Sequence, residues 1–321
     1  MHYRRLGRSG LKLSEIALGA WVTFGDQISE KTASQLIHVA YDKGINFFDN
    51  ADVNANGQAE VVMGKAIKDL PREALVISSK VFSQTMPGPN GRGLSRKHVT
   101  ESLHASLKRL DTDYLDLYFC HRFDPDTPID EIVYTMDALI RQGKILYWGT
   151  SEWRGYQIAT AIKIADQHHL APPIVEQPQY NMFHRYRVET DLAPVCKEFG
   201  IGLTTFSPLY YGILTGKYNK GIPKGTRAER DGYGWIRERI TPERIVIVDM
   251  LASLAQTLDL TAAQLAIAWL LRRKEVSSVI TGATRPKQLQ ENIAAGDVVE
   301  KLTDDVLEKV EQILGNYPDE D

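Results

Sequence analysis

The chain has 321 residues, of which 43% are hydrophobic and 25% charged, and its formal net charge is −3 at pH 7. This balance is ordinary for a soluble globular protein and gives no basic surplus for nucleic acid. The two cysteines, Cys120 and Cys196, make no disulfide framework, no run approaches the roughly 18 apolar residues of a membrane span, and the first residues lack the apolar core of a signal peptide. We therefore expect a cytoplasmic protein without membrane insertion.

Along the chain, short apolar runs typical of β-strands alternate with longer amphipathic runs typical of helices. The expected strands are 15–21, 45–50, 75–81, 114–121, 145–151, 174–180, 202–208 and 277–283. The expected helices are 30–43, 57–69, 95–109, 128–142, 154–168, 188–199, 243–273 in two pieces, and 286–295. Strands that alternate with helices indicate a parallel sheet, and most of these strands lack the apolar/polar alternation of a half-exposed sheet.

Eight such units predict an α/β protein with a (β/α)8 TIM barrel. A doubly wound open sheet is the alternative, but it usually carries G-x-G-x-x-G after its first strand, which "ALGAWVTFG" does not fit. No domain boundary is visible, so we expect a single barrel domain over 1–321. Three segments lie outside the repeat: a hairpin over 4–14 that would close the barrel bottom, a long loop over 210–242, and a terminal helix over 303–315. A long loop in a barrel is usually functional or disordered.

Three titratable residues end three successive expected strands: Asp49, Lys80 and His121. Alone, each is more often a cap, a solvated cation or a structural histidine. Together they indicate a site, because the catalytic groups of such barrels lie where strands end. These groups suit hydride transfer to a carbonyl, whose oxygen needs a proton donor as negative charge develops. A Tyr phenol could supply that proton. A nearby Lys would lower its pKa, an Asp would hold the Lys in place, and a His would donate a hydrogen bond to the same oxygen or relay a proton.

The sequence resembles the aldo-keto reductases over nearly its whole length. The resemblance is carried by "YRRLGRSGLKLSEIALGAW", "FFDNADV", "ISSKV", "LDLYFCHRFDP", "GKILYWGTSEW", "EQPQYNMFHR", "FSPLYYGILTGKY" and "ITGATRPKQLQENI". The phrases "YNMFHR", "LTGKY", "GIP", "GYGWIRERI" and "ILGN" are most similar to the branch that contains the voltage-gated potassium channel β subunits.

The resemblance implies a catalytic tetrad of Asp49, Lys80, His121 and a Tyr five residues after the Asp. That fourth position is Asn54. An amide can donate a hydrogen bond but cannot release a proton at ordinary pH. We therefore expect weakened carbonyl reduction, whether the Asn is natural or an introduced substitution.

The resemblance also implies NADPH/NADP+ as the cofactor, held without a Gly-rich phosphate loop. Residues 284–292 would hold the adenosine end and residues 207–227 the phosphates, while strand ends five and six would bond the nicotinamide carboxamide. Either Tyr180 or Phe206 would stack on the nicotinamide ring. The implied cofactor residues are Ser151, Gln177, Phe206, Ser207, Leu209, Lys217, Arg227, Thr284, Arg285, Gln288, Glu291 and Asn292. The expected substrate-side residues are apolar groups just beyond strand ends: Trp21, Phe24, Val53, Phe82 and Trp153.

Three functional hypotheses remain open. The first is an NADPH-dependent reductase of aldehydes or ketones, sugar-like carbonyls included, weakened by Asn54 and needing no metal. The second is an NADP(H)-binding accessory or redox-sensor subunit similar to the channel β subunits. The third is a structural barrel without cofactor. The resemblance leaves assembly open between a monomer and a homo-oligomer.

Overall fold

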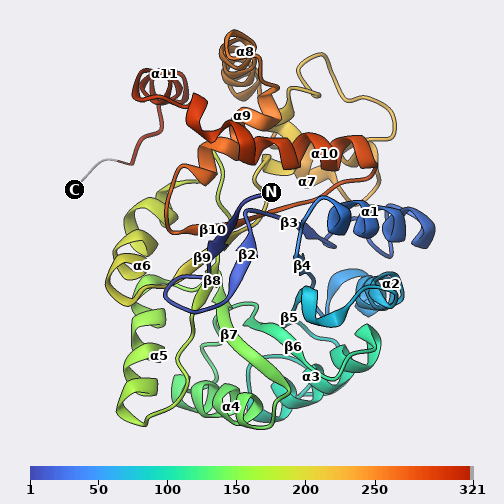
Figure 1. Cartoon of the computed structure of the whole chain (residues 1–321), viewed down its shortest axis with the longest axis vertical. Helices are drawn as coiled ribbons and strands as arrows, with labels where there is room; N and C mark the ends of the chain where they lie inside the picture. The colour runs from blue at the N-terminus through green and yellow to red at the C-terminus, as the bar shows by residue number, and fades with distance from the viewer. Residues whose placement is uncertain (319–321) are drawn as a thin grey trace.

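Eight parallel strands close into a barrel in the computed structural model, which describes residues 1–318 (Figure 1). Around the barrel the order is β10, β3, β4, β5, β6, β7, β8, β9. The strand bounds are β3 Ile16–Gly19, β4 Phe47–Asp49, β5 Val76–Val81, β6 Leu115–Cys120, β7 Ile145–Ser151, β8 Val175–Gln177, β9 Gly202–Thr205 and β10 Val276–Thr281. β8 is shorter than expected because it ends directly before Pro178, which has no N–H for the ladder. The predicted (β/α)8 barrel is confirmed.

Helices cover the outside of the barrel and follow the predicted spans closely (Figure 1). The α-helices are α1 Glu30–Asp42, α2 Gln58–Ile67, α3 Arg96–Leu110, α4 Ile129–Arg141, α5 Gly155–Gln167, α6 Ala193–Phe199, α7 Gly234–Arg237, α8 Pro242–Thr257, α9 Ala262–Leu271, α10 Pro286–Ala294 and α11 Asp304–Leu314. The 3₁₀ segments are η1 Asn54–Gly57, η2 Arg72–Ala74, η4 Tyr210–Thr215, η5 Arg227–Glu229 and η6 Ala295–Lys301, and a π-helical segment, η3 Arg187–Leu192, precedes α6.

The helix starts follow from their caps. The hydroxyl of Ser95 accepts a hydrogen bond from the backbone N–H of His98 at the start of α3. Thr261 and Gln264 form a reciprocal capping box at the start of α9. No helix in the described part of the chain is by itself long and apolar enough to span a membrane, and α8 with α9 meet that test only as a pair bent by 86°.

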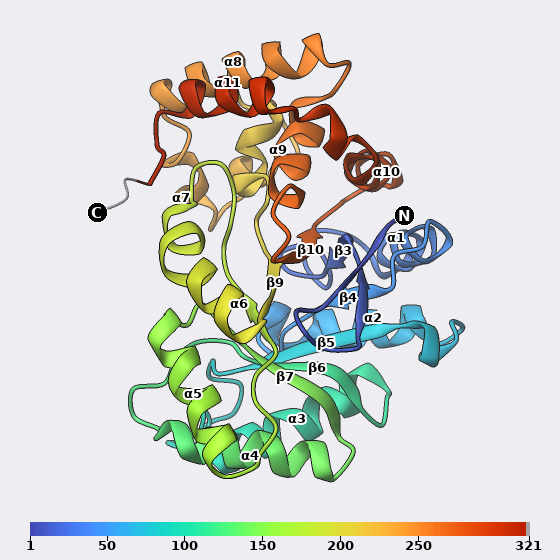
Figure 2. The same cartoon turned by 60° about the vertical axis from the view of Figure 1, so that its left-hand side comes forward.

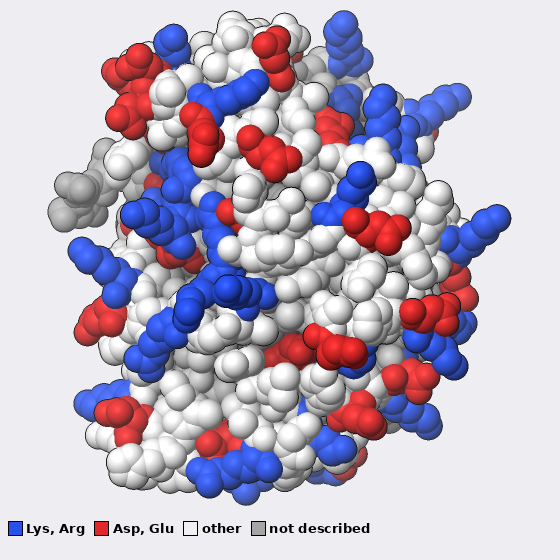
Figure 3. All heavy atoms as spheres, viewed as in Figure 1, with Lys and Arg blue, Asp and Glu red and all other residues white. Residues whose placement is uncertain are grey.

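The N-terminal hairpin closes one end of the barrel, as predicted. Its strands, β1 Tyr3–Arg5 and β2 Lys12–Ser14, pair antiparallel. Leu6 and Leu13 are fully buried in one apolar cluster with side chains from the barrel strands. A Cβ at Gly7 would lie 2.2 Å from the carbonyl oxygen of Gly200, so only glycine permits this close approach to the start of β9. Lys and Arg side chains gather at the left centre of this face of the molecule, and acidic and basic side chains are interspersed over the rest of it (Figure 3).

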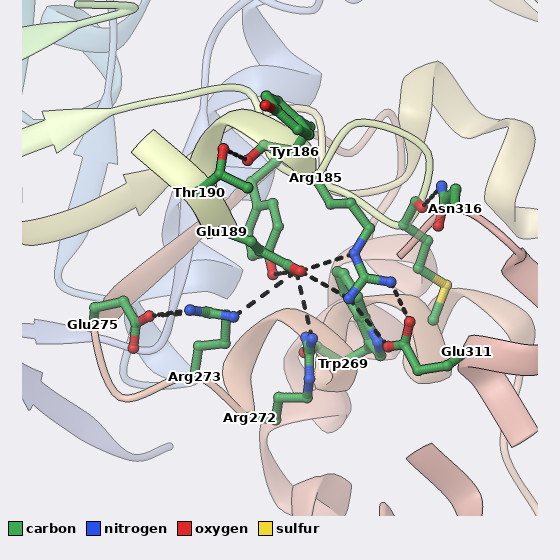
Figure 4. A network of polar contacts seen from close by, with 12 residues as sticks. Arg185, Tyr186, Glu189, Thr190, Trp269, Arg272, Arg273, Glu275, Glu311 and Asn316 are labelled. Atoms are coloured by element: carbon green, nitrogen blue, oxygen red, sulfur yellow. Dashed lines mark hydrogen bonds and ion pairs between the residues drawn. The ribbon is translucent and has the colours of Figure 1, made fainter. Parts of the chain in front are cut away.

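A buried ionic network ties the segment after β8 to the C-terminal helices (Figure 4). The side chain of Arg185 is 2% exposed and lies between the carboxylates of Glu189 and Glu311, on α11. Glu189 also accepts a hydrogen bond from the Tyr180 hydroxyl at 2.5 Å. α11 packs beside α8 at the same end of the molecule (Figure 2). The network therefore fixes the chain just beyond β8 against helices distant in sequence.

Candidate active site

Asp49 and Lys80 form a buried ion pair inside the barrel, at the ends of β4 and β5. Lys80 Nζ lies 2.7 Å from both carboxylate oxygens of Asp49 and 2.6 Å from the backbone oxygen of Asn50. Asp49 Oδ1 also accepts hydrogen bonds from Ser78 Oγ at 2.7 Å and from Gln177 Nε2 at 3.0 Å. Burial lowers the pKa of Lys80, and the Asp49 charge opposes that shift. These contacts hold the ammonium group at one fixed position.

His121 directly follows β6 and lines the same cavity as Asp49 and Lys80. Its Nδ1 is buried and has no hydrogen-bond partner among the described residues. Burial, with the nearby charges of Lys80 and Arg122, lowers the pKa of His121 well below its usual range. The imidazole is therefore neutral at neutral pH and can donate or accept one hydrogen bond at each nitrogen. Convergence of the three groups at one mouth, predicted from the strand ends, is confirmed.

Asn54 stands on the wall of this cavity at the start of η1. Its side chain is buried, and its Nδ2 donates a hydrogen bond to Asn50 Oδ1 at 3.1 Å. The amide thus sits beside the Asp49–Lys80 pair, because Asn50 connects the two through its backbone and its side chain. An amide at this point offers hydrogen bonds but no acidic proton.

The cavity has a volume of about 980 Å³ and opens at the carboxyl ends of the strands. It extends from the Asp49–Lys80 pair past the segment after β9 and the end of β10 to the start of α10. Every residue predicted to hold the cofactor lies on its wall: Ser151, Gln177, Phe206, Ser207, Leu209, Lys217, Arg227, Thr284, Arg285, Gln288, Glu291 and Asn292. Tyr180 does not line it, since its ring is buried against Trp269, so of the two rings expected to stack on the nicotinamide only Phe206 lies on the cavity wall.

Three cations on the cavity wall lie close enough to repel one another: Lys217, Arg227 and Arg285. None of them pairs with an Asp or Glu in residues 1–318. Burial, followed by the charges of the two arginines, lowers the pKa of Lys217 to about 8. Like charges that repel each other in a concave site favour a polyanionic ligand, and the nearby start of α10 adds free N–H groups. These residues fit the phosphate groups of a dinucleotide.

The substrate-side predictions are partly wrong. Trp21 and Val53 line the cavity. Phe24 and Trp153 do not, because Phe24 turns into the core and Trp153 is fully buried against Phe123, with ring centroids 5.1 Å apart. Phe82 also lies off the cavity wall, where the guanidinium of Arg92 covers its ring at 5.2 Å.

The cavity wall also holds residues that were not predicted from the sequence, among them Arg122, Gln179, Tyr211, Trp235 and Arg239. Arg122 could have been found because it directly follows His121, and Gln179 because it follows the end of β8. The other three come from the loop over 210–242, which has no periodic pattern from which to place a side chain.

Residues 15–314 match the profile of the Aldo/keto reductase family. The chain belongs to this family. It is 51% identical over 322 residues to a protein of Arabidopsis thaliana named "Probable voltage-gated potassium channel subunit beta", and the match covers 99% of this chain and 98% of that relative. A protein of the same name from Oryza sativa subsp. japonica is 48% identical over the same shares. The family and the branch suggested by the sequence are both confirmed, and this aldo/keto reductase is similar to these relatives from the hairpin to α11.

Proposed function

We propose that this aldo/keto reductase binds NADPH and reduces an aldehyde or ketone to the alcohol, at a rate weakened by Asn54. One observation carries the proposal. The Asp49–Lys80 pair, the neutral His121 and the Asn54 amide share a cavity whose wall also holds three unpaired cations.

The cavity residues divide between the two ends of such a cofactor. Lys217, Arg227 and Arg285 would hold its phosphates, while Ser151 and Gln177 at the ends of β7 and β8 would orient the nicotinamide. Gln177 already donates to Asp49, which links the nicotinamide end to the catalytic groups. NADPH, when bound, supplies the hydride for the carbonyl carbon.

The chain itself must handle the charge that develops on the carbonyl oxygen. Asp49 fixes Lys80, and the Lys80 charge stabilises that oxygen electrostatically. The neutral imidazole of His121 donates a hydrogen bond to the oxygen or relays a proton from water. Asn54 can bind the oxygen but cannot protonate it. Loss of a positioned general acid typically costs about 10²- to 10⁴-fold in rate.

The substitution Asn54→Tyr tests this proposal. It restores a phenol beside Lys80, so we expect NADPH oxidation on a panel of aldehydes and ketones to rise by about 10²- to 10⁴-fold. Asn54→Gln is the matched control, because it lengthens the side chain without adding an acidic proton, and its rate should stay near that of the wild type. Equal rates for all three proteins, with NADPH bound in each, would contradict the proposal.

A second function has specific support. The relatives carry the name of a potassium channel subunit, and Asn54 stands where a reductase needs a proton donor. An NADP(H)-binding accessory or redox-sensor subunit would bind the cofactor tightly and turn it over slowly.

Two buried free cysteines, Cys120 and Cys196, fit a reducing compartment such as the cytoplasm. Assembly into a homo-oligomer remains a prediction that light scattering tests.

A further inference from the structure

We propose that Arg122 and Arg239 select an anionic carbonyl compound, one whose carboxylate or phosphate group accompanies the aldehyde or ketone. The inference rests on the proposed function, because it names the substrate class of that same cavity. It concerns the side of the cavity next to Asn54 and His121, apart from the three cations assigned to the cofactor.

Aromatic contacts place Arg239 on one wall of the cavity. Tyr211 packs against Trp21 and Trp235, with ring centroids 6.2 and 4.7 Å apart. The guanidinium of Arg239 lies over both the Tyr211 and the Trp235 rings, at 5.8 and 5.3 Å. Trp21 also meets Phe206, at 6.3 Å, so this aromatic wall adjoins the position expected for the nicotinamide ring.

The other arginine belongs to the same rim. Gln179 donates from its side chain to the Tyr211 hydroxyl at 3.1 Å and from its backbone to Glu152 at 2.7 Å. Glu152 and Arg122 line the same cavity, and the guanidinium of Arg122 donates a hydrogen bond to the backbone oxygen of His121. Arg122 therefore lies next to the catalytic histidine on the wall that also carries Arg239.

The charges on this wall do not cancel. Arg187 neutralises Glu152 with an ion pair of 2.8 Å, and Lys80 neutralises Asp49. Burial raises the pKa of Glu176 to about 8, so this carboxyl is mostly uncharged at neutral pH. Arg122 and Arg239 remain, and neither pairs with a carboxylate within the described residues.

Two unpaired guanidinium groups beside a proton-transfer site favour an oxyanion on the substrate. Arginine binds carboxylate and phosphate through paired N–H donors, which fixes orientation as well as position. The rings of Trp21, Tyr211 and Trp235 would pack against the apolar part of the substrate between its anionic group and its carbonyl. Neutral aldehydes of the same shape would lack the charged contact.

Equilibrium binding of the product alcohols tests the inference without relying on carbonyl reduction. We expect para-hydroxymethylbenzoate to bind the wild-type protein, with NADP+ present, at least tenfold more tightly by calorimetry than its neutral amide, para-hydroxymethylbenzamide. Arg122→Gln and Arg239→Gln should each remove most of that preference and leave the affinity for the amide unchanged. The control Lys220→Gln removes an exposed cation of the same loop that lies off the cavity wall, and it should keep the preference.

Kinetics separate this inference from the proposed function. In the Asn54→Tyr protein we expect para-carboxybenzaldehyde to have a lower KM than para-formylbenzamide at a similar kcat. Arg122→Gln and Arg239→Gln, added to that protein, should raise the KM for para-carboxybenzaldehyde and leave the KM for para-formylbenzamide unchanged. The same comparison of glyceraldehyde 3-phosphate with glyceraldehyde tells whether phosphate is preferred to carboxylate. Reduction of all these aldehydes without any charge preference would overturn the inference and keep the proposed function. Equal binding of the benzoate and the benzamide would overturn it as well.

Discussion

At the scale of single residues, two lysines of the cavity differ in their partners within residues 1–318: Lys80 has a carboxylate beside it and Lys217 does not. The Lys80 ammonium is held by both oxygens of Asp49. Lys217 instead is largely buried and has the like charges of Arg227 and Arg285 nearby, and its pKa is lowered to about 8. A phosphate bound between them would reverse that shift, since an opposite charge favours the protonated amine.

The affinity for NADPH should therefore depend on pH through Lys217. Below about pH 8 the amine is already protonated in the free protein, so affinity stays level. Above about pH 8 binding must also take up a proton, so affinity falls by up to tenfold per pH unit until the higher pKa of the complex is reached. Fluorescence titrations between pH 6 and 10 measure this profile. Lys217→Met should bind more weakly at pH 7 and flatten the profile, whereas an unchanged slope in that variant would assign the titration to another group.

The position of Asn54 in the cavity was predictable from the sequence, but its hydrogen bond was not. Its position five residues after Asp49 is readable because the family pattern is local, and the structure places it on the cavity wall. Its hydrogen bond to Asn50 was not predictable, since that contact depends on the 3₁₀ turn over Asn54–Gly57.

At the scale of elements, the strands and helices were predictable because each barrel unit repeats one apolar strand and one amphipathic helix. The loop over 210–242 was not, because its order comes from contacts with remote segments. Arg230 pairs with Asp26 at 2.9 Å, and Tyr233 donates to the same carboxylate at 3.1 Å. Phe24 and Trp153 were misplaced for a related reason: an apolar residue after a strand can face either the cavity or the core, and only packing decides.

The network around Arg185 gives a prediction at this scale (Figure 4). Arg185→Met should lower the free energy of unfolding by about 3–5 kcal/mol, because it removes the buried guanidinium that pairs with both Glu189 and Glu311 and leaves Glu189 only its longer contacts with Arg272 and Arg273, at 3.6 and 3.9 Å. Urea denaturation measures the loss. Arg141→Met is the matched control, since it breaks another i,i+4 pair, with Asp137, whose arginine side chain is 68% exposed, and it should cost about 1 kcal/mol or less.

Equal losses in the two variants would show that the buried network adds nothing beyond an exposed pair.

The network also bears on the cofactor cavity, because Asn181, four residues before Arg185, donates to the backbone oxygen of Ser207 at 3.0 Å on the cavity wall. Arg185→Met should therefore weaken NADPH binding as well as folding.

At the scale of the whole molecule, closure of the barrel brings together groups that are far apart in the sequence. Asp49 and Gln177 are bonded although 128 positions separate them. The eightfold strand and helix repeat was enough to predict this convergence, because parallel strands in a closed barrel all end at one mouth. The repeat does not predict the anionic preference that we propose for the cavity, because Arg239 and its aromatic neighbours belong to the loop between β9 and α8.

The central claim is that the cavity holds NADPH beside a carbonyl compound but has an amide, Asn54, in place of the phenol that would protonate the carbonyl oxygen efficiently. Single-turnover oxidation of bound NADPH by an aldehyde tests it most directly, because this experiment separates the chemical step from cofactor exchange. We predict that the wild-type protein and the Asn54→Tyr variant bind NADPH alike, and that the variant oxidises it about 10²- to 10⁴-fold faster. A wild-type chemical step as fast as that of the variant would contradict the account.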